Sequence, residues 1–227
     1  MVEPFIRPLA EKVAAFVYNP ENLEIIGIAS EHEQEQATIL VCDLTQSSLL
    51  FHEMGTSAAV QHINEFFERI CDIGLAYGAT IDKYTGDGVL LKFNVPRRIK
   101  NHTYQAAKAS LEMKRVFDKM KSEWCTMGEP LTSLYIRIGI AMGQIFEAIV
   151  GHPQYQHLTV FGPPVNIATN LCDIAPRDRS VILIDEQAYR ELQGKALVAK
   201  ISKAQLGKVT FYAEAAYELQ GLAEESL

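Results

Sequence analysis

A short apolar run that ends at an acid constrains the fold more than any other feature of the sequence. Residues 38–42 do not alternate between polar and apolar types, and Asp43 follows them directly. A run of this length without alternation predicts a β-strand buried on both faces. The sheet that contains this strand must therefore be covered by other elements on both sides.

The remainder of the chain supplies such elements. Apolar residues recur every three or four positions in two long segments, and a glycine-containing loop at residues 85–88 separates two extended runs, which is typical of a hairpin. Helices are predicted at residues 57–77, 103–124 and 165–174, and a short helix that Asp185 caps is predicted to end at Leu192. Strands are predicted at residues 38–42, 79–84, 89–93, 134–141, 145–150, 181–184 and 209–219. This order predicts an α+β fold, a ferredoxin-like mixed sheet covered by helices.

The pattern also predicts how the chain is divided. Residues 1–36 are expected to form an N-terminal helix, at 5–17, and a polar connector. Residues 37–220 are expected to form the main domain, and residues 221–227 a short tail.

Composition excludes several classes of partner. The chain has 227 residues and a formal net charge of −7, without the basic stretch that a nucleic-acid binder requires. Its apolar runs are shorter than the roughly 18 residues of a membrane span, and no signal peptide is evident. Its four cysteines form no CxxC pair. We therefore expect a soluble cytoplasmic protein with no nucleic-acid or membrane partner.

Two acids are the first candidates for chemistry. Asp43 follows the buried strand, and Asp87 lies at the predicted hairpin tip. Neighbouring strands are about 4.8 Å apart, so the two carboxylates can converge if these elements are adjacent. Such a pair binds hard divalent cations together with substrate phosphates. The alternative is that Asp43 ends a strand and Asp87 builds a turn, roles in which Asp is common.

Four ordered segments favour the first interpretation. They are DLTQSS at 43–48, KYTGDGV at 83–89, RIGIAMG at 137–143 and FGPPVNIA at 161–168. Together they resemble the class III nucleotidyl cyclase catalytic domain, the family of adenylate and guanylate cyclases, over roughly residues 38–184. The resemblance implies a homodimer with active sites at its interface. It also implies conversion of a nucleoside triphosphate to a 3′,5′-cyclic monophosphate and pyrophosphate, with two Mg²⁺ or Mn²⁺ ions per site.

The resemblance also assigns roles to individual residues. Asp43 and Asp87 match the metal-binding aspartates, and Asn166 matches the asparagine that positions the ribose and stabilises the transition state. Lys83 and Thr159 match the base-selecting pair. The loop formed by Leu44, Thr45, Gln46 and Ser47 matches the backbone that cradles the phosphates.

Two departures from the family pattern leave a second interpretation open. Gln46 stands in the phosphate loop where glycine is usual, and Asn170 stands where an arginine stabilises the transferring phosphate. A neutral amide cannot replace a bidentate guanidinium. The alternative to an active enzyme is therefore a catalytically silent cyclase-like module that binds nucleotide or regulates a partner.

The base also stays open. A lysine and threonine pair resembles the adenine-selecting type, which favours ATP. A chain that is almost all catalytic domain resembles instead the pyrimidine cyclases of bacterial antiphage signalling, which make cyclic UMP or cyclic CMP for a separate effector protein. ATP and a pyrimidine triphosphate are both retained as candidates, ahead of GTP.

Overall fold

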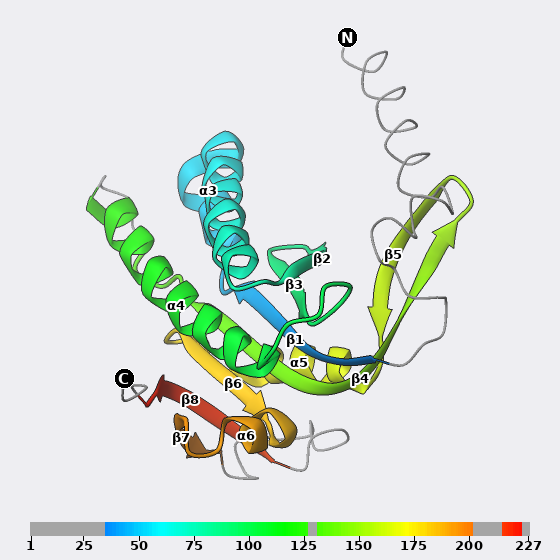
Figure 1. Cartoon of the computed structure of the whole chain (residues 1–227). Coiled ribbons are helices and arrows are strands. Elements are labelled where there is room, and N and C mark those ends of the chain that lie inside the picture. The colour runs from blue at the N-terminus through cyan, green and yellow to red at the C-terminus, as the bar shows by residue number, and fades with distance from the viewer. Residues whose placement is uncertain (1–34, 127–130, 202–214, 224–227) are drawn as a thin grey trace.

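The computed structural model describes residues 35–126, 131–201 and 215–223 (Figure 1). The predicted N-terminal helix and most of the predicted connector lie outside these residues. The domain boundaries at residues 36 and 220 therefore stay predictions.

The described residues form one mixed sheet. Its strands are β1 (Glu35–Leu44), β2 (Thr80–Thr85), β3 (Gly88–Phe93), β4 (Ile136–His152), β5 (Tyr155–Phe161), β6 (Val181–Asp185), β7 (Ala196–Lys200) and β8 (Ala216–Leu222). Seven follow the order β2-β3-β1-β4-β6-β8-β7, and β5 pairs with the far half of β4 as an arm that projects from the sheet (Figure 1). The β4–β6 pair is parallel and the other pairs are antiparallel, so the predicted mixed sheet is confirmed.

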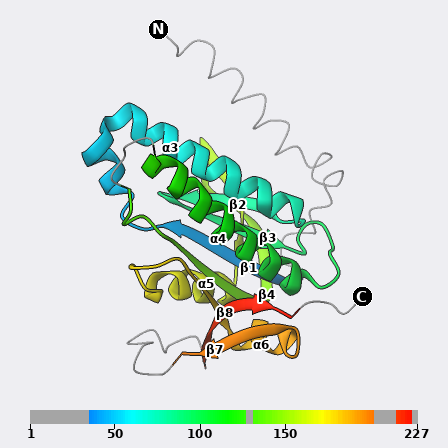
Figure 2. The ribbon, with the colours of Figure 1, turned by 90° about the vertical axis from the view of Figure 1, so that its left-hand side faces the viewer.

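Helices cover both faces of this sheet. They are α3 (Ser48–Ala76), α4 (His102–Thr126), α5 (Pro163–Ile174) and α6 (Glu186–Leu192). The long helices α3 and α4 lie on one face and α5 lies on the other (Figure 2). The predicted α+β class is thus confirmed for the described residues.

Burial of β1 on both faces is confirmed as well. Leu40 and Cys42 are fully buried in the core that contains α3 and α4. Ile39 and Val41 point to the opposite face and join the core that contains α5. Alternate residues of a strand face opposite sides of the sheet, so β1 needs apolar residues at successive positions.

Several elements differ from the prediction. The predicted strands 134–141 and 145–150 form the single strand β4, and strand β5 was not predicted. Helix α3 begins at Ser48, nine residues before the predicted start. Gly55 interrupts its helical conformation (φ 76°, ψ 166°), so the apolar pattern of the sequence does not indicate the first helical piece. Strand β7 was not predicted, since its side chains are half-buried or exposed and its apolar pattern is weak. The last strand occupies Ala216–Leu222; residues 209–214 of the predicted strand lie outside the described residues.

Helix α5 lies very close to β4 at Gly139. A Cβ atom at this glycine would overlap the Ala168 carbonyl oxygen and lie 2.8 Å from the Cys172 amide nitrogen. Both obstacles are backbone atoms of α5, so they cannot move away as a flexible side chain could. The absence of a side chain at Gly139 therefore sets the distance between α5 and the sheet.

We expect Gly139→Ala to lower the free energy of unfolding by about 2 kcal/mol or more, because α5 must be displaced to accept the methyl group. Urea unfolding followed by circular dichroism measures this loss. Gly221→Ala is the control, because the atom nearest to the added carbon, Leu197 Cδ1, is 3.8 Å away, an ordinary contact. Equal stability of the two variants would contradict the close approach of α5.

Asp185 connects α6 to the sheet. Its Oδ1 accepts hydrogen bonds from the backbone N–H groups of Ala188 (2.8 Å) and Met142 (3.4 Å). The predicted N-cap is thus confirmed. Burial raises the pKa of Asp185 to about 6, although these N–H groups oppose the rise.

A carboxyl group with a raised pKa in the folded state makes folding less favourable once it ionises. The contribution of Asp185 to stability is therefore lost as the pH rises from about 4 to about 6. We expect Asp185→Asn, which keeps the N-cap acceptor, to match the wild type at pH 4 and to exceed it by roughly 1–2 kcal/mol at pH 8. Denaturant unfolding at both pH values measures the difference, and a difference that does not change with pH would contradict it.

Candidate functional site

The two candidate metal-binding acids lie on adjacent strands. Asp43 is opposite Gly88 in the β1–β3 pairing, and the Leu44 N–H donates to the Asp87 carbonyl oxygen at 3.3 Å. Burial raises the pKa of Asp43, and the negative charge of Asp87 contributes to the rise. The Asp87 carboxylate therefore lies close enough for its charge to act on Asp43.

The partner of Asp43 is Arg137, and the sequence pattern did not predict this pairing. It lies directly opposite Asp43 in the β1–β4 pairing and forms an ion pair with its carboxylate. The guanidinium also donates to the Asp173 carbonyl oxygen of α5 at 3.1 Å, and the side chain is only 7% exposed. The sequence did contain a signal, because an arginine inside a buried apolar strand requires a counter-charge.

The candidate phosphate loop connects β1 to α3. The Thr45 N–H donates to the Tyr135 carbonyl oxygen at 2.8 Å, while the Ser47 hydroxyl donates to Asp87. Among the described residues, the backbone N–H groups of Gln46 and Ser47 have no acceptor. These two groups are therefore available for an anion at the start of α3.

Gln46 takes the backbone conformation expected of the glycine that it replaces. Its φ angle is +56°, in the left-handed region that glycine favours. The loop thus keeps the turn despite the side chain, which points outward and donates to the Ser133 carbonyl oxygen at 3.4 Å. The replacement of glycine by Gln46 therefore leaves a turn that a glycine would also adopt.

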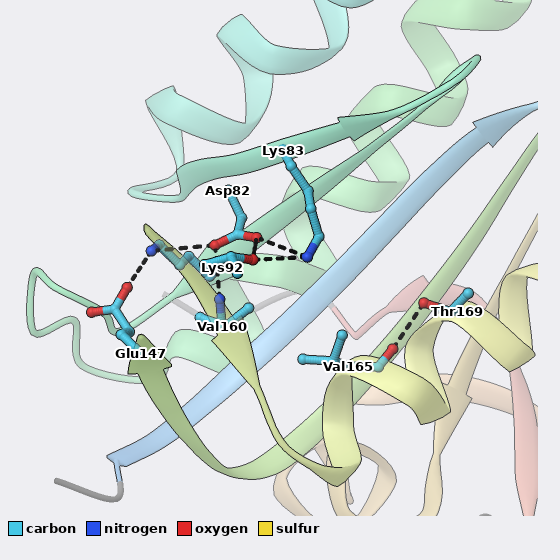
Figure 3. Close-up of polar contacts among 8 residues, drawn as sticks. Asp82, Lys83, Lys92, Glu147, Val160, Val165 and Thr169 are labelled. Carbon is cyan, nitrogen blue, oxygen red and sulfur yellow. Dashed lines mark hydrogen bonds and ion pairs between the residues drawn. The ribbon is translucent and has the colours of Figure 1, made fainter. Parts of the chain in front are cut away.

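Lys83 of β2 and Thr159 of β5 are in direct contact. Lys83 Nζ donates to Thr159 Oγ1 at 2.7 Å, and Thr159 Oγ1 donates to Asp82 Oδ2 at 2.6 Å (Figure 3). Thr159 is only 1% exposed, whereas one third of the Lys83 side chain is exposed. Of the two residues, Lys83 is the one that a ligand can reach.

Asn166 lies on the exposed side of α5, four residues before the half-buried Asn170. Residues at this spacing share one face of a helix. Pro163 and Pro164 form the first turn of α5, where their missing N–H groups break no helical hydrogen bond. The position of the family arginine therefore lies beside Asn166 but carries an amide.

The residues fit a metal ion that takes its other ligands from the substrate. No group of three or more His, Cys, Asp or Glu side chains that could hold a metal occurs within the described ranges. Asp43 and Asp87 supply two carboxylates, which is the usual protein contribution to a Mg²⁺ ion bound together with nucleotide phosphates.

Asp43 and the candidate base-selecting residue Lys83 lie on strands that are not adjacent. Lys83 is opposite Leu90, which is opposite Val41, so Lys83 is two strands away from β1. Two strand spacings amount to about 10 Å. In the part of the chain that the structure describes, no hydrogen bond or ion pair joins Asp43 to Lys83.

Comparison with known proteins identifies the family. A sequence profile of the adenylate and guanylate cyclase catalytic domain matches residues 29–218. The chain belongs to this family. Its fold resembles that of the adenylyl cyclase CyaB from P. aeruginosa, with a TM-score of 0.74 and 22% identity over 86% of this chain and 98% of that one.

Other similar proteins extend this comparison. The guanylate cyclase domain of RhGC from Catenaria anguillulae, solved in complex with GTP, has a TM-score of 0.70 and 18% identity over 85% of this chain and all of that one. The uncharacterized protein Rv1320c of Mycobacterium tuberculosis is 29% identical over 70% of this chain. The chain spans about a quarter of the length of the curated relatives that it matches, 26% for this one.

Within the described residues, no helix has the length and hydrophobicity that crossing a membrane requires.

Loss of Asp43 should destabilise the cyclase domain, because Arg137 would keep a buried charge without its carboxylate. We expect Asp43→Ala to lower the free energy of unfolding by about 3 kcal/mol. Asp87→Ala should change it by about 1 kcal/mol or less, since it removes one hydrogen bond but also a like charge beside Asp43. Denaturant unfolding of both variants tests this, and equal losses would show that Arg137 does not depend on Asp43.

Proposed function

We propose that this domain converts a nucleoside triphosphate to a 3′,5′-cyclic nucleotide monophosphate and pyrophosphate. The observation that carries the proposal is the convergence of Asp43 and Asp87 beside the two unpaired N–H groups of the Gln46–Ser47 turn. Carboxylates for cations and N–H donors for phosphate oxygens are what a triphosphate site needs.

Each group has a part in this reaction. Two Mg²⁺ or Mn²⁺ ions, when bound, lower the pKa of the ribose 3′-hydroxyl and shield the charge of the phosphates. Asp43 and Asp87 would hold these ions, and the Gln46 and Ser47 N–H groups would orient the phosphates. Arg137 balances the charge of Asp43 and fixes its direction at the end of β1.

The proposed enzyme works as a homodimer with its active sites at the interface. Lys83 lies two strands away from Asp43 on one chain, which supports a site assembled from two copies. One copy would supply Asp43 and Asp87, and its partner would supply the base-contacting lysine and the exposed Asn166 that contacts the ribose.

Adenine and a pyrimidine are the favoured bases, ahead of guanine. Lys83 donates hydrogen bonds, and adenine, cytosine and uracil all offer an acceptor to it. If the product is cyclic UMP or cyclic CMP, we propose that it acts on a separate effector protein in antiphage signalling. If the product is cyclic AMP, it serves as a conventional second messenger.

A silent nucleotide-binding module is the second candidate, and Asn170 is the observation that favours it. This position lies beside Asn166 on α5 without a positive charge. Loss of one preorganised donor to the transition state slows an enzyme by roughly a hundredfold to a thousandfold. The retained acids and the retained turn at Gln46 favour the active enzyme.

Incubation of the purified protein with Mn²⁺ and each of ATP, GTP, CTP and UTP, followed by mass spectrometry, tests the proposal. We expect one cyclic monophosphate as the main product. Asp87→Asn should abolish it, because it removes a metal ligand at little loss of stability, while Asp72→Asn, an exposed aspartate on α3, should leave it unchanged. Nucleotide binding without any cyclic product would favour the silent module, and full activity of Asp87→Asn would refute the mechanism.

A further inference from the structure

Asp82 is a buried carboxylate at the centre of the base-selecting region. Its side chain is fully buried, yet it contacts two lysines, a hydroxyl and a backbone N–H (Figure 3). Oδ1 accepts from the Val160 N–H at 3.2 Å and lies 3.5 Å from Lys92 Nζ. Oδ2 accepts from the Thr159 hydroxyl and lies 3.7 Å from Lys83 Nζ. A carboxylate can only accept hydrogen bonds, so each of these groups must donate.

A β-bulge makes this arrangement possible. Ile81 pairs with Leu91 and Lys83 pairs with Leu90, so Asp82 is an extra residue with no partner on β3. Neighbouring residues of a regular strand point to opposite faces. The bulge redirects the chain, so that Asp82 and Lys83 both reach the Thr159 hydroxyl.

The contacts fix the direction of each hydrogen bond. The proton of the Thr159 hydroxyl is committed to Asp82, so its oxygen must accept from Lys83. One of the three Lys83 N–H groups is used in this way, which leaves two for a ligand. Because Thr159 is 1% exposed, it acts on a ligand through Lys83 rather than by touching it.

We propose that Asp82 is a specificity-determining positioning residue, which holds the Lys83 ammonium through Thr159 so that Lys83 donates to an acceptor on the nucleotide base. This inference rests on the proposed nucleotide site. Lys92 and Glu147 form an ion pair on the other side of Asp82, where both are nearly buried, and complete its neutralisation.

The substitution Asp82→Asn breaks this relay without leaving an unpaired buried cation. Lys92 keeps Glu147 as its partner. The oxygen of the new side-chain amide must face Lys92 and the Val160 N–H, because both groups can only donate. Its NH₂ group must then face Thr159. The Thr159 proton then has no carboxylate to accept it, and Lys83 loses its fixed position.

The test measures binding by competition with a fluorescent nucleoside triphosphate in the presence of Mn²⁺. The competitors are ATP, GTP, CTP, UTP and inorganic triphosphate, which has no base. We expect Asp82→Asn to weaken binding of the preferred nucleotide about tenfold or more, and to reduce its preference over the other three, because a charge-assisted hydrogen bond is lost. Binding of inorganic triphosphate should not change.

A matched control and a double-mutant cycle separate this role from general destabilisation. Asp118 on α4 also accepts from a lysine, Lys114, and a hydroxyl, Ser180, so Asp118→Asn should leave both kinds of binding unchanged. In a Lys83→Met background, Asp82→Asn should have no further effect, since Asp82 acts through Lys83. An additional loss in that background, or an equal loss for inorganic triphosphate, would overturn the inference.

The outcomes also distinguish the inference from the proposed function. If the wild type binds a preferred nucleotide but makes no cyclic product, the function fails and the binding comparison still tests Asp82. If the wild type is active and Asp82→Asn keeps its affinity and preference, only the inference about Asp82 fails. A wild type that binds none of the four nucleotides refutes both the proposed function and the inference. If Asp82→Asn does not fold, Thr159→Val should lose the preference and Thr159→Ser should keep it; retention by Thr159→Val would contradict the relay.

Discussion

The pairing of β1 with both β3 and β4 determines where the two candidate acids and Arg137 lie. This register sets Asp43 opposite Arg137 on one side and next to the Asp87 hairpin on the other. A slip of one residue would turn Asp43 into the core of α3 and α4. The apolar residues that β1 buries on both faces make such a slip unfavourable, so the hydrophobic core maintains the geometry of the acids.

Two groups of buried charges lie on the side of the sheet that faces α5. Asp43 and Arg137 form one group at the end of β1, and Asp82, Lys92 and Glu147 form the other between β2 and the β4–β5 arm. Buried ion pairs contribute little net stability, because desolvation offsets their attraction. Their value here is positional: each fixes a side chain that the proposed reaction uses, Asp43 for the metal and Lys83 for the base.

The two departures from the family pattern have different consequences. Gln46 keeps the left-handed turn, so the loop retains N–H groups that can face a phosphate. Asn170 offers no comparable substitute, because an amide carries no charge to place beside the transferring phosphate. The proposed site thus retains the turn of its phosphate loop but has no positive charge at Asn170.

The amino-acid sequence alone was sufficient for the mixed α+β sheet, the buried strand, the β2–β3 hairpin and the N-cap at Asp185, because strand burial, capping and hairpin turns leave local patterns. It was not sufficient for the first part of α3, hidden by Gly55, or for the weakly patterned edge strand β7. The roles of Arg137 and Asp82 arise only when distant segments pack together. Arg137 acquires its carboxylate through the register of two strands, and Asp82 acquires Thr159 through a bulge and an arm 77 residues further along the chain. Local sequence encodes neither contact, because each depends on how the strands align in three dimensions.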